Sequence, residues 1–171
     1  MKVFINAGHG GNDPGAVSKN GTKEKDINLT VSSLLAKQLI ALGYDVEFYQ
    51  QKKSLTEVAY TENSSDSDLF ISIHCNSATN PNATGLEVLY HSTSVKGKKY
   101  AQSIQEELVK YTNLKNRGIK PRTDLHVLKK TFAPAVLVEL AFLSNVVEEK
   151  LLTGNPEMFA TGIVNGIRKI L

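Results

Sequence analysis

Several features that mark specialised classes of protein are scarce in these 171 residues. Cys75 is the single cysteine, so no disulfide can form within the chain. The apolar run near the N-terminus, Val3 to Ile5, is far too short for a signal-peptide core or a membrane span. The 20 Lys and Arg residues are spread along the chain, for a net charge of +3, and form no basic arm. The sequence therefore argues against a disulfide scaffold, a membrane protein and a nucleic-acid-binding protein.

Two common catalytic motifs are also missing. Residues 7–15 are rich in glycine, but they lack the G-x-G-x-x-G order and the lysine of a P-loop, so nucleotide binding is not expected. None of the serines stands in a G-x-S-x-G context, which leaves a serine hydrolase without support.

The composition that remains is that of a globular domain, with 41% hydrophobic and 22% charged residues. We see no internal repeat and no linker, so we predict one domain over residues 1–171. Apolar runs predict strands at residues 2–6, 44–49, 69–74, 85–91 and 135–140, and helical spacing predicts helices at 27–42, 55–62, 100–111 and from 156 to the C-terminus. This alternation predicts an α/β fold with a mainly parallel twisted β-sheet flanked by helices on both faces.

Polar residues stand at the ends of three predicted strands. His9 follows the first strand, His74 closes the third, and Glu139 interrupts the apolar run of the last. In open α/β sheets ligands bind beyond the carboxyl ends of the strands, where such side chains converge. Glu24 lies three residues before Ile27, at the start of a helix and on the side that faces the sheet. It can therefore point into the same crevice.

Two imidazoles and one carboxylate are a common ligand set for catalytic zinc. We therefore predict that His9, Glu24 and His74 bind one Zn²⁺ per chain. A further carboxylate that does not bind the metal can take a proton from the attacking water and return it to a leaving amine. Glu139 suits this catalytic role, because its apolar neighbours should raise its pKa, although the zinc charge would oppose the shift.

Each of these residues also has a simpler explanation when it is taken alone. His9 would then be a loop histidine, Glu24 an acidic residue at the positive end of a helix, and His74 a histidine of the core. Their convergence favours the site. Cys75 adjoins His74 but points to the opposite face of the strand, so we expect it to pack.

Two further histidines lie near predicted strand ends or loops. His91 and His126 are candidates for lining a substrate groove without binding metal.

Four segments that carry these residues resemble, in order, the motifs of the zinc-dependent N-acetylmuramoyl-L-alanine amidases called Amidase 3. The segments are INAGHGGNDPGA, TKEKDINL, DLFISIHCNS and AVLVELAFLSN, and GLEVLY and NRGIK between them also look like family segments. The resemblance runs from about Lys2 to the last predicted helix and implies that His9, Glu24 and His74 are zinc ligands and Glu139 the catalytic acid/base. The implied reaction hydrolyses the bond between the lactyl group of muramic acid and the first L-alanine of the peptidoglycan stem peptide.

The resemblance also implies a setting. We expect peptidoglycan as the partner, a monomer, and action at the cell wall or outside the cell, as an autolysin or a phage endolysin. Export would then depend on a trimmed leader, a neighbouring domain or release of the phage type. Two other functions stay open at this point: a zinc exopeptidase that trims cell-wall peptides, and a catalytically silent wall-binding module.

Overall fold

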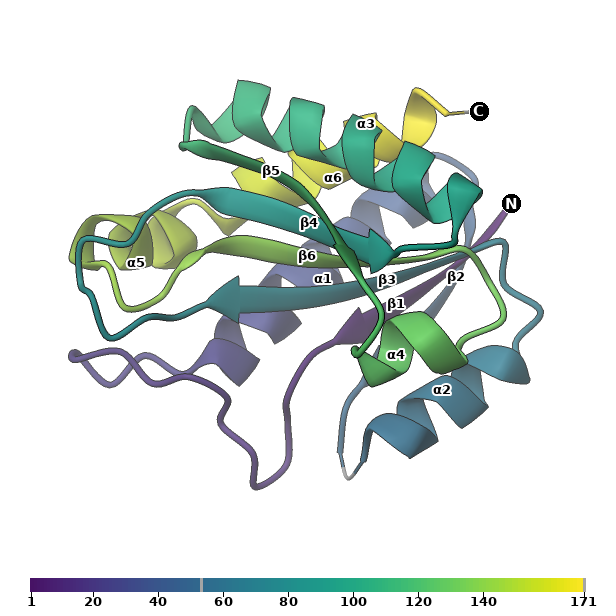
Figure 1. The fold of residues 1–171 in the computed structure, drawn as a ribbon, viewed down its shortest axis with the longest axis horizontal. Helices are drawn as coiled ribbons and strands as arrows, with labels where there is room; N and C mark the ends of the chain where they lie inside the picture. Colours follow the sequence, from purple (N-terminus) through teal and green to yellow (C-terminus); the bar gives the residue numbers. More distant parts are fainter. Residues whose placement is uncertain (53, 171) are drawn as a thin grey trace.

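The computed structural model describes residues 1–52 and 54–170 and contains a six-stranded β-sheet with helices on both faces (Figure 1). The strands are β1 (Lys2–Ala7), β2 (Asp45–Gln50), β3 (Leu69–Asn76), β4 (Leu86–His91), β5 (Asn116–Arg122) and β6 (Ala135–Phe142). The helices are α1 (Glu24–Ala41), α2 (Leu55–Asn63), α3 (Val95–Thr112), α4 (His126–Lys130), α5 (Val146–Gly154) and α6 (Pro156–Arg168). The predicted α/β fold is confirmed.

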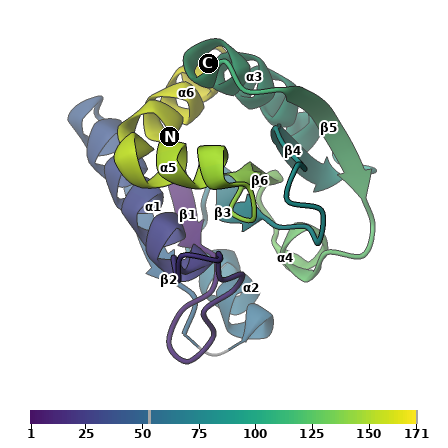
Figure 2. The same ribbon diagram turned by 90° about the vertical axis from the view of Figure 1, so that its left-hand side faces the viewer.

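The sheet is mainly parallel, as the sequence predicts. Its strand order is β2-β1-β3-β6-β4-β5, and the first four of these strands run parallel to one another. β4 runs antiparallel to β6, and β5 is parallel to β4. The carboxyl ends of β1, β3 and β6 therefore share one edge of the sheet with the amino end of β4. Figure 2 views the molecule from this edge.

The two faces of the sheet are covered unequally. Helices α1, α3 and α6 pack on one face over a large apolar core. On the other face α2 and α4 enclose a smaller cluster, in which the rings of Phe4 and Phe70 stack with centroids 5.8 Å apart. Alternate residues of a strand share a face, so Ser72 and His74 continue the Phe70 face toward the carboxyl edge. At that edge this face presents polar side chains.

The predicted helix ends follow their local signals. Gly43, two residues beyond α1, has a φ of 84°, a left-handed conformation that glycine adopts without strain, so the helix stops where the sequence indicates. Pro156 opens α6 at its first turn. None of the helices within the described ranges combines the length and the apolar character that crossing a membrane requires.

Three elements were not predicted from the sequence. β5 has the sequence NRGIKPR, in which Gly118 and Pro121 are poor strand formers, and it is an edge strand, where proline is tolerated. α4 is five residues long, too short to show helical spacing. α5 begins with two valines, and its start is marked by Asn145, whose side chain accepts hydrogen bonds from the amides of Val147 and Glu148.

Helices α3 and α6 pack closely through glycine. A Cβ atom at Gly166 would lie 2.5 Å from the Cα atom of Ile104. This contact is with backbone, which cannot move aside as a flexible side chain would. Gly166 therefore permits the close approach of the two helices.

We expect Gly166→Ala to lower the free energy of unfolding by about 1–3 kcal/mol, because the added methyl group overpacks the α3–α6 contact. Urea unfolding followed by circular dichroism measures this change. Gly154→Ala is the matched control, because no described atom lies within 4 Å of the Cβ position there. Equal stability of the two variants would show that this close approach is not set by Gly166.

Candidate metal centre

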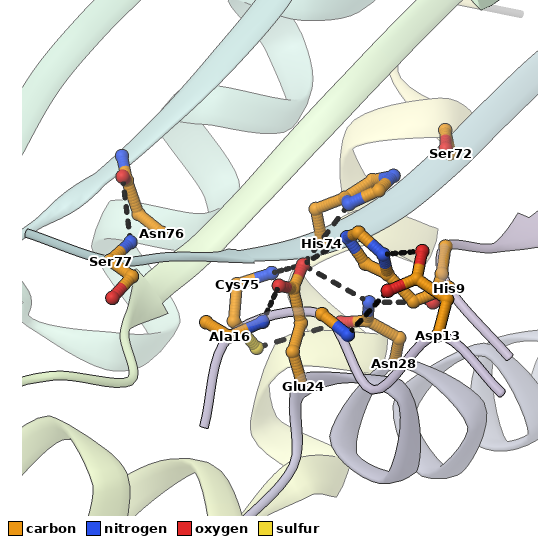
Figure 3. A network of polar contacts seen from close by, with 12 residues as sticks. His9, Asp13, Ala16, Glu24, Asn28, Ser72, His74, Cys75, Asn76 and Ser77 are labelled. Atoms are coloured by element: carbon orange, nitrogen blue, oxygen red, sulfur yellow. Dashed lines mark hydrogen bonds and ion pairs between the residues drawn. The ribbon is translucent and has the colours of Figure 1, made fainter. Parts of the chain in front are cut away.

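The loop that follows β1 carries His9 to the carboxyl edge of the sheet. His9 has a φ of 60°, in the left-handed region that non-glycine residues rarely occupy. The turn around it is closed by two backbone hydrogen bonds between Gly10 and Asp13, of 3.0 and 2.9 Å. The Asp13 carboxylate lies 2.8 Å from His9 Nδ1. Nδ1 is thus engaged by Asp13, while Nε2 lies 3.3 Å from Glu24 Oε1 (Figure 3).

Glu24 is the first residue of α1, and its carboxylate is buried at the positive end of that helix. Oε2 accepts a hydrogen bond of 2.8 Å from the backbone amide of Ala16. Oε1 accepts one of 3.1 Å from the amide of Cys75 on β3. Backbone groups from two other segments therefore orient this carboxylate.

His74 reaches the same carboxylate from β3. Its Nδ1 lies 3.1 Å from Glu24 Oε1, and its ring meets that of His9 edge to face, with centroids 5.1 Å apart (Figure 3). The ring packs directly on the backbone of Gly8, where a Cβ atom would lie 2.2 Å from His74 Nε2. Residue 8 must therefore lack a side chain for His74 to occupy this place.

The structure brings together the three predicted ligands. His9, Glu24 and His74 each offer one ligand atom, and these atoms all lie within 4.8 Å of one another. Two imidazole nitrogens and a carboxylate oxygen are a donor set that suits zinc and leaves a coordination position for water or substrate. Both histidines are partly exposed, so the site is open to solvent, as expected of a catalytic rather than a structural centre.

Glu139 lies beside this cluster on the neighbouring strand. It is the Cα partner of His74 in the parallel β3–β6 register, so the two side chains share a face of the sheet. Its Oε2 atom is buried and has no hydrogen-bond partner among the residues that the structure describes. Burial raises the pKa of Glu139 to about 7, against the opposing effect of His74. A carboxyl group with this pKa can both accept and donate a proton near neutral pH.

The polar row continues across β4. Glu87 is the antiparallel partner of Glu139, and its carboxylate accepts hydrogen bonds of 2.9 Å from Asn76 Nδ2 and 3.2 Å from Arg117 Nε. Sequence reasoning did not single out these residues. Arg117 and Glu87 lie in the family-like segments NRGIK and GLEVLY, which is the signal that would have found them.

Two other supporting residues were also missed. Asn28 Nδ2 donates a hydrogen bond of 2.9 Å to the Gly8 carbonyl, and it lies one helical turn after Glu24. Asp13, four residues after His9, orients that ring. A carboxylate that orients a ligand histidine is a common companion of metal sites, and this was the available sequence signal.

The remaining candidates lie outside the cluster. His91 ends β4, next to Tyr90, which pairs with Val136 near the start of β6, so it lies toward the opposite edge of the sheet. His126 is the first residue of α4. Cys75 is buried against α1, and its thiol donates to Asn28 Oδ1 over 3.5 Å, which confirms that it packs.

The ionisable groups of the cluster change the pKa values of His9 and Glu24. The hydrogen bond with Glu24 raises the pKa of His9 to about 9, burial acts against this, and the Asp13 contact adds to it. Burial opposes ionisation of Glu24, yet the hydrogen bonds from His74 and His9 hold the pKa of its carboxyl group well below the ordinary value. In the protein without metal, His9 and Glu24 thus form an ion pair.

Comparison with known proteins places the chain in a defined group. The sequence model of the family Amidase 3, described as N-acetylmuramoyl-L-alanine amidase, matches residues 3–169. The chain is 32% identical to the N-acetylmuramoyl-L-alanine amidase CwlM of Bacillus licheniformis, over 99% of this chain and 68% of that protein. It is 35% identical to the endolysin of Bacillus phage SPP1, over 99% of this chain and 65% of that protein.

The fold is shared with solved structures of the same description. The crystal structure of an N-acetylmuramoyl-L-alanine amidase from Clostridium difficile 630 superposes with a TM-score of 0.89 at 35% identity. That likeness covers 98% of this chain and 95% of the other. This chain therefore shares its overall fold with that amidase.

The metal-free protein should lose stability as the pH rises from about 6.5 to about 9. The pKa of His9 is raised on folding, so its contribution is fully present below the unfolded pKa of 6.5 and is lost through the folded value of about 9. Urea unfolding at pH 6 and pH 9.5 in the presence of a chelator measures the loss. His9→Asn is the control, because asparagine tolerates the left-handed backbone and lacks the titrating ring. An equal loss of stability in wild type and His9→Asn would contradict the attribution of this pH dependence to His9.

Proposed function

The chain belongs to the Amidase 3 family of N-acetylmuramoyl-L-alanine amidases, and we propose that its hydrolytic site is a zinc centre formed by His9, Glu24 and His74. The enzyme hydrolyses the amide bond between the lactyl group of N-acetylmuramic acid and the L-alanine of the peptidoglycan stem peptide. The observation that carries the proposed centre is the convergence of three ligand atoms within 4.8 Å at the open edge of the sheet.

The donor set fits zinc by its chemistry and by its support. Each ligand is already held: His9 by Asp13, Glu24 by two backbone amides, and His74 by its contact with the backbone of Gly8. Such support lowers the entropic cost of forming the site. When bound there, zinc supplies Lewis-acid polarisation of the scissile carbonyl and makes water a nucleophile at neutral pH.

We assign the proton transfers to Glu139. Burial raises its pKa to about 7 in the protein without metal, which favours a carboxylate that accepts a proton from the attacking water. The same group then donates that proton to the nitrogen of L-alanine, so that the peptide leaves as a neutral amine. The place of Glu139 beside His74, its register partner on the same face of the sheet, supports this role.

We also propose that residues 1–171 act as one catalytic domain on the cell wall, outside the cytoplasm. Relatives named as bacterial amidases and as a phage endolysin support this, since both kinds share the domain. All three proposed ligands and Glu139 come from one chain, so a monomer is sufficient for the reaction.

Removal of zinc should abolish the amidase activity. We expect a chelator to inactivate the enzyme and added Zn²⁺ to restore it, and His74→Ala to bind less than one zinc per chain by atomic absorption. His91→Ala is the matched control, because His91 lies outside the cluster, and it should keep both metal and activity. Stoichiometric zinc in His74→Ala would refute the ligand assignment.

Glu139→Gln should lower kcat by a factor of about 10²–10⁴, the usual size of acid/base catalysis, because the amide cannot carry the proton. Zinc content should be unchanged, since Glu139 is not among the ligands. The assay is mass spectrometry of digested peptidoglycan, in which wild type releases peptides with free L-alanine amino termini and forms no new reducing sugars.

Other products would identify the other functions. Shortened stem peptides that remain attached to glycan would indicate an exopeptidase. No product from zinc-loaded wild-type protein, together with binding to the wall, would indicate a silent binding module. Full activity of Glu139→Gln would disprove its role in proton transfer.

A further inference from the structure

The first turn of α5 carries two adjacent carboxylates that take no part in the reaction described above. Glu148 and Glu149 are 2% and 4% exposed, which is unusual for acidic residues unless they are fully hydrogen-bonded. Neighbouring residues of a helix point about 100° apart, so the two side chains diverge. Figure 2 shows α5 at the carboxyl edge of the sheet, above the residue 8–23 loop drawn in purple.

Glu149 reaches into the residue 8–23 loop. Its Oε1 atom accepts hydrogen bonds of 2.6 Å from the hydroxyl groups of Ser18 and of Thr22. Its Oε2 atom accepts one of 2.8 Å from Asn20 Nδ2. Both oxygens are thus satisfied by three side chains of one tight turn, and these contacts lie 127 to 131 residues away along the chain.

That turn delivers one of the proposed zinc ligands. Its two arms are joined by the bridge between Val17 and Lys23, and the residues that flank this bridge are Ala16 and Glu24. Glu24 donates its backbone N–H to the Ala16 carbonyl over 2.9 Å and accepts the Ala16 N–H at Oε2. The anchoring of the turn by Glu149 therefore fixes the pair of residues that sets the Glu24 carboxylate.

Glu148 reaches in the other direction, to the strands that carry Glu139 and its partner. Its Oε2 atom accepts the backbone N–H of Phe142, three residues after Glu139, at 2.6 Å. Its Oε1 atom accepts the N–H of Gly85 at 2.7 Å and the hydroxyl of Thr84, just before β4. One carboxylate thus joins the end of β6 to the start of β4.

We propose that Glu149 and Glu148 are positioning residues for different parts of the catalytic centre. Glu149 positions the metal ligand Glu24, and Glu148 positions the end of the strand that carries Glu139. The inference rests on the proposed zinc centre. It goes further in assigning separate effects to two neighbouring residues: loss of Glu149 weakens metal binding, whereas loss of Glu148 slows turnover.

Glu149→Ala should weaken zinc binding by a factor of about 10–100, the usual effect of residues that support a ligand. Competition with a chromophoric chelator measures this affinity on the folded protein. Glu149→Gln should stay within about threefold of wild type, because the amide of Asn20, which is exposed, can rotate to present its oxygen to the new NH₂ group. If Glu149→Ala does not fold, Thr22→Val, which removes one of the three contacts, should still lower the affinity measurably.

Glu148→Gln should show the opposite pattern. Its two oxygens accept backbone N–H groups of Gly85 and Phe142, which cannot reverse their polarity, so one of them would face an NH₂ group. We expect kcat to fall at least tenfold while zinc affinity stays within about threefold of wild type. Glu157→Ala is the control, because Glu157 stands in the first turn of α6 but is exposed.

The two proposals fail in different ways. Wild-type protein that neither binds zinc nor cleaves peptidoglycan would overturn the proposed function. A wild type that does both, with Glu149→Ala folded and binding zinc as tightly, would overturn the positioning role of Glu149. Equal losses of zinc affinity in Glu148→Gln and Glu149→Ala would overturn the division between them.

Discussion

The site is organised around the buried carboxylate of Glu24. A carboxylate removed from water is costly unless donors surround it, and the chain supplies them from separate segments. The amide of Ala16 comes from the loop after β1, and the amide of Cys75 comes from β3. His9 and His74 then approach the same oxygen, Oε1. The loop, α1 and the central strand therefore meet at this one group, which is the proposed metal site.

The backbone around that point is constrained accordingly. His9 occupies a left-handed conformation, which is unfavourable for a non-glycine residue and must be maintained by its surroundings. The hydrogen bonds of the Gly10–Asp13 turn and the contact of its ring with Asp13 provide that support. Gly8 leaves room for the ring of His74. Local strain and close packing are thus concentrated at the residues that would carry the metal.

The sheet face that bears the site has two regions with different roles. Phe4, Phe70 and their neighbours form an apolar region under α2 and α4, which stabilises the domain. Toward the carboxyl edge the same face bears His74 and Glu139, both partly buried. The long buried strand β6 connects the regions, and its apolar surroundings are what raise the pKa of Glu139 toward neutrality.

Local patterns were enough to predict the α/β fold and to select His9, Glu24, His74 and Glu139. The spacing of apolar residues distinguishes buried strands from amphipathic helices. Burying a polar residue that interrupts such a pattern at a strand end costs free energy unless the residue has a hydrogen-bond or ionic partner. These signals need no knowledge of distant contacts. The structure confirms the fold and brings the three predicted ligand atoms together.

Tertiary contacts decided the rest. The reversed direction of β4 depends on its antiparallel pairing with β6, and that of β5 on its parallel pairing with β4. The spacing of apolar residues within a strand encodes neither pairing. The sequences of α4 and α5 favour a helix only weakly, because α4 is five residues long and α5 begins with two valines. Both helices form because other parts of the chain pack on them. Glu148 and Glu149 would read as ordinary surface acids in the sequence. They became buried anchors because donors from distant parts of the chain, such as Ser18 for Glu149 and Gly85 for Glu148, converge on them in the folded protein.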